Sequence, residues 1–199
     1  MKRIIILVLL SFLIKDNIYA QSEKGDFTLS PYIGINFSTY FSDADYKERY
    51  AAAFGANVDY YFNDRWSLRT GVMFNPMGAE DGFNNTDKLN YLSVPINANW
   101  HFGGNRNWYL NFGPVLSFLL SADSELSGGD KMDIKDFVPG FDFGIGFGIG
   151  YKFPINEKLE LFFDYQGLGG LIDIDKESLL DYEINNSKNA FHFGAIFDL

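Results

Sequence analysis

The side chains best suited to chemistry are one histidine and one aspartate in the last third of the chain. His192 and Asp164 each lie in a segment of alternating residues, near its expected outer end, so the two can come within reach of each other. A histidine beside a carboxylate can act as a general base. No serine stands in obvious partnership with them, and His101 is expected at the opposite end. Because catalysis also needs a nucleophile and an oxyanion donor, a hydrogen-bonded structural histidine is the favoured interpretation and no catalytic residue is assigned.

Two acidic segments are candidates for a metal site. Residues 121–137 hold five aspartates and glutamates, and residues 173–177 hold three at alternating positions. Calcium requires about six to eight oxygen ligands, usually around a glycine-supported turn, and Ser178 stands where an EF-hand loop would have that glycine. Solvated acidic loops are therefore the favoured interpretation. We expect no metal and no cofactor, and the lack of cysteine excludes disulfides and thiolate metal sites.

The elements that must position these groups are β-strands. Between Phe141 and Phe153 every odd position is large and apolar, and the even positions are Asp142, four glycines and Lys152. A period of two over such a length predicts a strand with one oily face and one polar face. Glycine on the polar face indicates that the walls on that side come very close. A narrow transmembrane β-barrel has this cross-section.

Eight segments share this alternation, and no charge falls on the outward register of any of them. They span approximately residues 27–37, 51–62, 66–75, 91–102, 108–118, 141–153, 159–166 and 191–199. The fold class predicted is all-β, an eight-stranded antiparallel up-and-down transmembrane barrel. Its inward charges are expected to compensate one another in a filled lumen, as a lumen charge cluster of Asp59, Arg69, Asp142, Lys152, Glu160, Asp164 and His192.

The connections between these segments alternate in length. The expected short ones are 63–65, 103–107 and 154–158, and the expected long ones are 38–50, 77–88, 121–137 and 169–188. Outer-membrane barrels have short periplasmic turns and longer external loops. This rhythm predicts both mature termini in the periplasm. Amphipathic rings beside the short turns suit the headgroup level, so we expect a periplasmic aromatic girdle of Trp66, Trp100, Trp108, Tyr151 and Phe153.

The N-terminus has the three zones of a secretory signal peptide. A basic Lys2-Arg3 is followed by an apolar core from Ile4 to Ile14, which is too short to span a bilayer, and then by Ala20. We predict a signal peptide over residues 1–20 and a barrel domain over residues 21–199. Removing residues 1–20 takes the net charge from −10 to −12, since three basic residues and one acidic residue are lost. Such an acidic protein is not expected to bind nucleic acid.

The chain resembles the PorT-like outer-membrane β-barrel family, within the OmpA/OmpX-like eight-stranded barrels of Gram-negative bacteria. The matching stretches are residues 91–96 (Tyr-Leu-Ser-Val-Pro-Ile), 108–114, 141–153 and 165–169. The resemblance implies location in the cell outer membrane, contact with its lipid and lipopolysaccharide, and, for some members, a link to protein secretion. The terminal residues His192, Gly194, Phe197 and Leu199 look like the β-signal read by the barrel-assembly machinery, although that signal usually ends in an aromatic residue.

These observations predict a barrel that is not an enzyme and has a structural or interaction role. The long acidic external loops are the expected contact for a protein partner. Three alternatives remain open: a lipid-modifying enzyme using His192 with Asp164, a narrow solute pore, and a secreted lipocalin-like carrier. A lipocalin would need its apolar face inward, around a ligand.

Overall fold

The computed structural model describes residues 23–177 and 181–199, so the predicted signal peptide lies outside the described residues. Eight long strands form most of the molecule: β1 (Phe27–Phe41), β2 (Lys47–Asn63), β3 (Trp66–Met77), β5 (Thr86–Phe102), β6 (Trp108–Glu125), β8 (Phe141–Asn156), β9 (Leu159–Asp173) and β10 (Asn185–Asp198). Two short strands, β4 (Ala79–Glu80) and β7 (Lys131–Asp133), and a 3₁₀ turn, η1 (Lys135–Phe137), lie in the connections.

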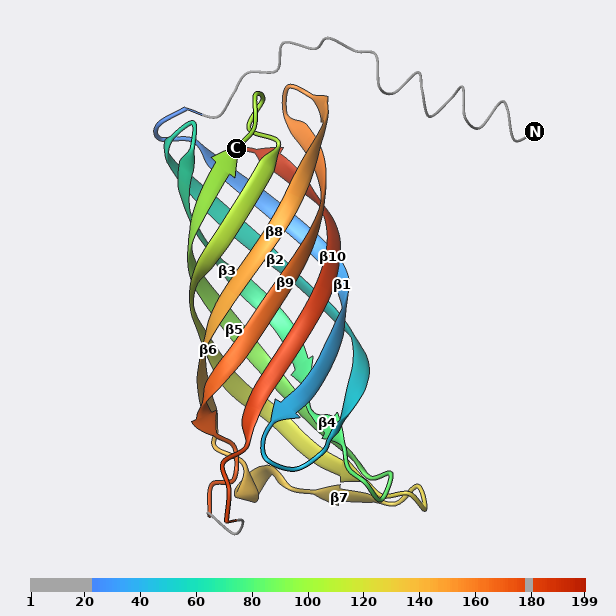
Figure 1. Cartoon of the computed structure of the whole chain (residues 1–199). Coiled ribbons are helices and arrows are strands. Elements are labelled where there is room, and N and C mark those ends of the chain that lie inside the picture. Colours follow the sequence, from blue (N-terminus) through green and yellow to red (C-terminus); the bar gives the residue numbers. More distant parts are fainter. Residues whose placement is uncertain (1–22, 178–180) are drawn as a thin grey trace, which may run out of the picture.

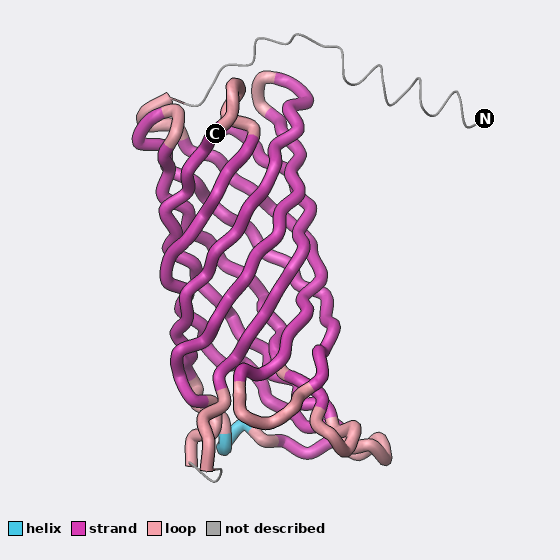
Figure 2. The backbone as a smooth tube through the Cα atoms, viewed as in Figure 1, coloured by secondary structure: helices cyan, strands magenta, loops and turns pink. Residues whose placement is uncertain are grey.

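The eight long strands form a closed antiparallel barrel. Each pairs with the next long strand along the chain, and β1 also pairs with β10 from Thr28↔Asp198 to Phe41↔Asn185. Closure leaves the barrel wall without a free edge, which is one of the two ways in which backbone polar groups can be satisfied in lipid. The strands tilt around the barrel axis in Figure 1, and Figure 2 shows how little of the chain is helix. The eight-stranded prediction is confirmed.

The predicted faces of the strands are also confirmed. Ile33 and Phe147 are more than half exposed on the outside, whereas Tyr32, Tyr109 and Phe162 are buried inside. This arrangement is the opposite of a soluble ligand-carrying barrel, which keeps its apolar face inward. The lipocalin-like alternative is therefore wrong.

The strand boundaries differ from the prediction at one end of the barrel. β1 continues to Phe41 and β2 already begins at Lys47, so only residues 42–46 connect them. Likewise, β6 continues to Glu125 and β10 begins at Asn185. The outward positions there carry polar residues such as Ser121 and Asp123, so the apolar–polar alternation of the sequence is lost although the backbone pairing continues.

The two ends of the barrel differ in their connections, which are short at one end and longer at the other. The short-turn end carries residues 64–65, 103–107 and 157–158, and the chain ends there at Leu199 (Figure 1). The loop end carries residues 42–46, 81–85, 126–140 and 174–184, with β4 and β7 beside them. The 154–158 connection proves shorter than expected, because Pro154 to Asn156 remain in β8.

The close packing of the Tyr109 ring against β8 explains why Gly150 has no side chain. A Cβ atom added at Gly150 would lie 2.3 Å from Cζ of the Tyr109 ring and 2.7 Å from Cβ of Asp164. Tyr109 is fully buried and cannot move aside into solvent. By contrast, a Cβ atom at Gly169, on the outer face of β9, would meet nothing within 4 Å.

Replacing Gly150 by leucine should therefore destabilise the barrel, because the new side chain overlaps the Tyr109 ring. Overpacking costs about 1 to 3 kcal/mol or more in a closely packed interior. Urea unfolding of the refolded barrel, followed by tryptophan fluorescence, measures the change. Gly169→Leu is the matched control and should leave the midpoint nearly unchanged. Equal shifts for the two variants would mean that the Tyr109 ring is not packed against Gly150.

Candidate functional site

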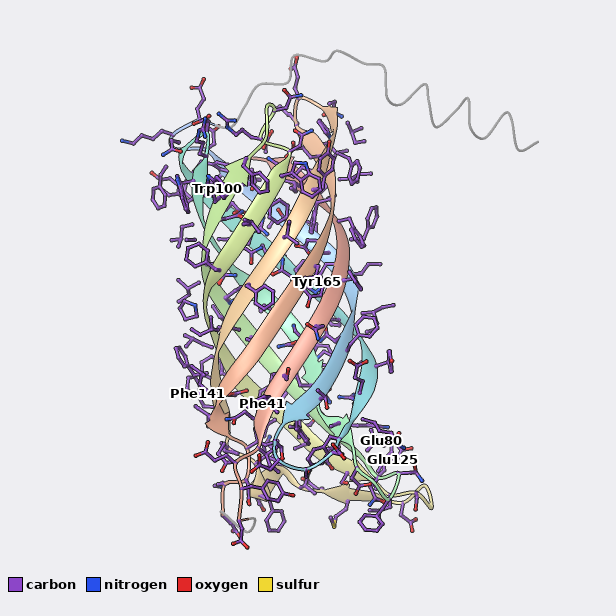
Figure 3. All side chains as sticks on the ribbon, in the orientation of Figure 1. Phe41, Glu80, Trp100, Glu125, Phe141 and Tyr165 are labelled. Atoms are coloured by element: carbon purple, nitrogen blue, oxygen red, sulfur yellow. The ribbon has the colours of Figure 1, made fainter. Side chains whose placement is uncertain are left out.

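A row of aromatic rings surrounds part of the short-turn end. Ring centroids lie 6.3 Å apart between Trp66 and Trp100, and 4.9 Å apart between Trp108 and Tyr151. Phe102 joins these pairs, at 4.9 Å from Trp100 and 6.2 Å from Trp108. Phe153 extends the row, at 4.8 Å from Tyr151. All five predicted girdle residues thus lie in one band across β3, β5, β6 and β8, and Figure 3 places Trp100 near this end.

Asp59 and Arg69 form a buried ion pair of the barrel interior, toward the short-turn end. They face each other across β2 and β3, and Nε of Arg69 lies 3.0 Å from Oδ2 of Asp59. Ser67 donates to Oδ1 of Asp59 at 2.8 Å and Asn99 donates to it at 2.9 Å. Both charged side chains are almost fully buried, so the carboxylate replaces lost water by four hydrogen bonds from three side chains.

Ser67 and His101 lie together in the same region, a pairing that the sequence did not suggest. Oγ of Ser67 is 3.0 Å from Nε2 of His101. A serine has one proton, and an ionised Asp59 can only accept, so the Ser67 hydroxyl donates to Asp59 and accepts from Nε2 of His101. A histidine that donates to the serine cannot act as its base. This contact is therefore structural and is not a nucleophile–base pair.

His192 and Asp164 do meet, as the sequence predicted, but in the middle of the barrel. They are directly opposite each other on β10 and β9, with 3.2 Å between Nδ1 and Oδ1. Tyr109 and Gln166 both donate to Oδ2 of Asp164, at 2.8 Å and 2.7 Å. The expected position near the outer rim is wrong, because β10 begins at Asn185 and not beyond Lys188.

The remaining predicted lumen charges lie apart from these two groups. Lys152 pairs with Glu160 at 3.2 Å near the short-turn end. Asp142 lies toward the loop end, where Asn186 donates to it at 2.8 Å. The predicted cluster is thus two ion pairs, one histidine–carboxylate contact and one amide-bound carboxylate. Arg69 connects its own ion pair to the histidine–carboxylate contact through Tyr109, whose ring centroid is 4.6 Å from Cζ of Arg69.

Lys188 is an interior charge that the sequence prediction missed. Its side chain is buried, and Nζ donates to Oδ1 of Asn75 at 2.8 Å. Asn75 also accepts from Asn36 and donates to Ser93, so the polar interior continues toward the loop end. The prediction placed residue 188 in a loop. Its even number, shared with the inward residue His192, was the signal that could have found it.

An apolar cluster closes the barrel interior at the loop end. We call it the mouth cluster: Tyr40, Met77, Ala79, Leu89, Tyr91, Val115, Leu119, Ala122, Val138, Leu168, Ile174 and Ile184. Its members come from β1, β3, β4, β5, β6 and β9 and from two of the connections. Met77, Leu89 and Ala122 are at most 1% exposed, so apolar side chains are closely packed at this end of the interior. The sequence prediction of solvated loops missed this cluster.

The outer rim beyond the mouth cluster is strongly acidic. Residues 42–50, 77–88, 120–140 and 171–187 carry sixteen carboxylates and six lysines or arginines, a net charge of −10. Two ion pairs join neighbouring elements there, Lys47 with Glu80 and Lys88 with Glu125 (Figure 3). Within the described residues no group of three or more His, Asp or Glu side chains is placed to hold a metal ion.

One rim carboxylate is held by its own loop. Burial acts to raise the pKa of Asp81, but hydrogen bonds from Asn85 and Phe83 and the charge of Lys47 outweigh it and lower the pKa. The backbone N–H groups of Phe83 and Asn85 both donate to Oδ1 of Asp81, at 2.8 Å. Asp81 therefore remains ionised and gives the 81–85 connection a defined shape, with Phe83 projecting from it at 82% exposure.

The four residues of the predicted β-signal lie on the strand that closes the barrel. His192 and Gly194 point inward, and a Cβ atom at Gly194 would lie 2.3 Å from the carbonyl oxygen of Pro31 on β1. Phe197 and Leu199 are exposed on the outside at the short-turn end.

No helix among residues 23–177 and 181–199 combines the length and apolar character needed to span a membrane. A family model described as "Outer membrane protein beta-barrel domain" matches residues 19–176. Comparison with curated proteins finds no match.

Three solved structures illustrate the similarity of fold. OprG from Pseudomonas aeruginosa has a TM-score of 0.55 at 13% identity, covering 90% of this chain and 98% of its own. Neisserial surface protein A (NspA) has a TM-score of 0.55 at 16% identity, covering 86% and 96%. Ail, the attachment invasion locus protein of Yersinia pestis, in complex with the heparin analogue sucrose octasulfate, has a TM-score of 0.50 at 17% identity, covering 88% and 99%.

Proposed function

The chain belongs to the outer membrane protein β-barrel domain family, and we propose that it acts as a closed barrel that binds a protein partner with a basic surface through its loop end. It is an integral protein of the outer membrane. We propose the finer assignment to the PorT-like barrels chiefly from the stretch at residues 91–96. That assignment would imply a link to protein secretion.

The proposed orientation places the loop end outside the cell and the short-turn end in the periplasm. The aromatic row from Trp66 to Phe153 would then lie at the inner headgroup level. Both ends of a mature chain starting at residue 21, after removal of residues 1–20, would be periplasmic. The barrel-assembly machinery would recognise β10 through His192, Gly194, Phe197 and Leu199, and the outward apolar face would contact lipid and lipopolysaccharide.

The observation that carries the proposal is the composition of the outer rim. Its net charge of −10 accounts for most of the −12 of the proposed mature chain. Exposed apolar side chains lie within this acidic field, among them Phe41, Phe83 and Met132. Aromatic anchors surrounded by charge are typical of protein–protein contacts, since the ring supplies affinity and the charge selects the partner.

The barrel interior supports a role without conduction. The mouth cluster packs the loop end, and the Asp59–Arg69 ion pair and the contact between His192 and Asp164 occupy the interior farther from that end. An enzymatic role has less support, because His192 and Asp164 are buried inside the barrel and Ser67 donates to Asp59. We therefore propose an interaction protein in preference to a pore or a lipid-modifying enzyme.

Site-specific crosslinking tests the proposal. A photoreactive amino acid at Phe83 or Met132 should crosslink to a protein partner in intact cells, because both side chains project from the rim. The same probe at Lys158, in a short turn, is the matched control and should give none of these products. Added polylysine should compete with the partner for the acidic rim, because polylysine and the proposed basic surface of the partner are both positively charged.

Two results would contradict the proposal. One is identical crosslinked products from Phe83 and Lys158. The other is a partner complex that persists when Glu80, Asp81 and Asp130 are all changed to their amides.

A further inference from the structure

A small cavity in the barrel interior is lined by two basic side chains, a histidine and several amides, with apolar residues between them. Its volume is about 40 Å³, and Arg69, Lys188 and His192 line it together with the amides of Asn97 and Asn111. None of its lining residues is an aspartate or a glutamate. On this measure a water molecule needs about 10 to 15 Å³, so the cavity can hold a small ion with one or two waters.

Lys188 is a buried cation on this cavity whose ammonium group has few hydrogen-bond acceptors. Its ammonium has three donors, but among the described residues its recorded hydrogen bond is the one to the neutral Asn75. No carboxylate within residues 23–177 and 181–199 lies within ion-pair distance of Nζ. The side chain is only 4% exposed. The carboxylate of Asp164 acts on the Lys188 charge only from beyond ion-pair distance. Burying a charge is costly unless it is paired, and Lys188 lacks a contact partner of opposite charge among these residues.

The neighbouring amides also have unused hydrogen-bonding groups. Nδ2 of Asn97 donates to Oδ1 of Asn111 at 3.1 Å. The other amide atoms, Oδ1 of Asn97 and Nδ2 of Asn111, are buried and have no partner among the described residues. Both residues line the same cavity as Lys188, so a free amide donor of Asn111 faces the space that the Lys188 side chain also borders.

We propose that this cavity binds one small monovalent anion, chloride or an ion of similar size. The ammonium of Lys188 and the amide of Asn111 would donate to the anion, and the guanidinium of Arg69 would add to the positive potential. A water molecule accompanying the anion would donate to Oδ1 of Asn97. The bound ion would stabilise the folded barrel, since it binds the native state and not the unfolded chain.

The first experiment measures the chloride dependence of thermal unfolding. The full barrel, refolded in detergent, should unfold at a higher temperature in sodium chloride than in sodium gluconate of equal ionic strength. Lys188→Met should remove this difference. Lys131→Met is the matched control, because Lys131 is exposed on β7, and it should retain the difference. An equal chloride response in Lys188→Met and Lys131→Met would overturn the proposal.

A second variant and a direct measurement keep the proposal testable if Lys188→Met does not fold. Asn111→Asp preserves the acceptor for Asn97 and adds a negative charge at the cavity, so it should fold and lose the chloride response. In crystals of the unaltered protein grown in bromide, an anomalous peak is expected between Lys188 and Asn111. A cavity holding only water, with no anomalous signal, would overturn the proposal.

Discussion

Replacing Asp59 by alanine is expected to lower the free energy of unfolding by about 3 to 5 kcal/mol, because it leaves the buried guanidinium of Arg69 without its counter-charge. The variant also removes the acceptor for Ser67 and Asn99, which are both buried. Urea titration of the barrel in phospholipid vesicles, followed by the fluorescence of its three tryptophans, measures the loss.

Two further variants separate this effect from loss of any ion pair. Asp64→Ala breaks the pair with Arg106 at 2.9 Å, but Asp64 is 40% exposed, so the expected loss is at most about 1 kcal/mol. Adding Arg69→Met to Asp59→Ala should restore part of the stability, because the orphaned charge is removed with its partner. Equal losses from Asp59→Ala and Asp64→Ala would show that the interior pair is hydrated.

Replacing Phe147 by arginine is expected to cost about 2 to 4 kcal/mol, the penalty for a lipid-facing arginine at the bilayer midplane. Phe147 is the middle residue of the outward row from Phe141 to Phe153, and its side chain is 54% exposed. The free energy of unfolding from phospholipid vesicles measures this penalty.

Phe83→Arg is the matched control, because Phe83 is also an exposed phenylalanine but lies on the outer rim. It should change the stability by no more than about 0.5 kcal/mol. If both arginine variants were tolerated equally, the face carrying Phe147 would not contact lipid.

The register of the strands could be predicted from the sequence because it follows from a local pattern. In a pleated strand, side-chain direction depends only on whether a residue number is odd or even. Lipid outside and a narrow interior then select opposite residue types, so Phe147 and Gly148 alone indicate which side is which. The same alternation, applied within each strand, placed Asp59 and Arg69 inside and the aromatic row from Trp66 to Phe153 outside.

The partners of the interior groups could not be predicted from the sequence. They depend on the stagger between paired strands and on which strands lie opposite each other across the barrel. Tyr109 reaches Asp164 from 55 positions away in the chain, and Lys188 reaches Asn75 from 113. The loop end was hardest to predict for a related reason. Beyond the outward apolar band, Met77, Leu89 and Ile174 are apolar residues that pack inside the barrel mouth, so the rule of polar inside and apolar outside does not identify them.

The sequence by itself determined a closed barrel with an oily outside, a polar inside and an acidic rim, because these properties depend on residue type and parity. Only the tertiary structure decided that His192 and Asp164 lie at mid-barrel, that apolar side chains gather at the mouth, and that Lys188 and Asn111 line one cavity without a carboxylate. Those features come from contacts across the closed sheet, where strand length and stagger set which side chains meet.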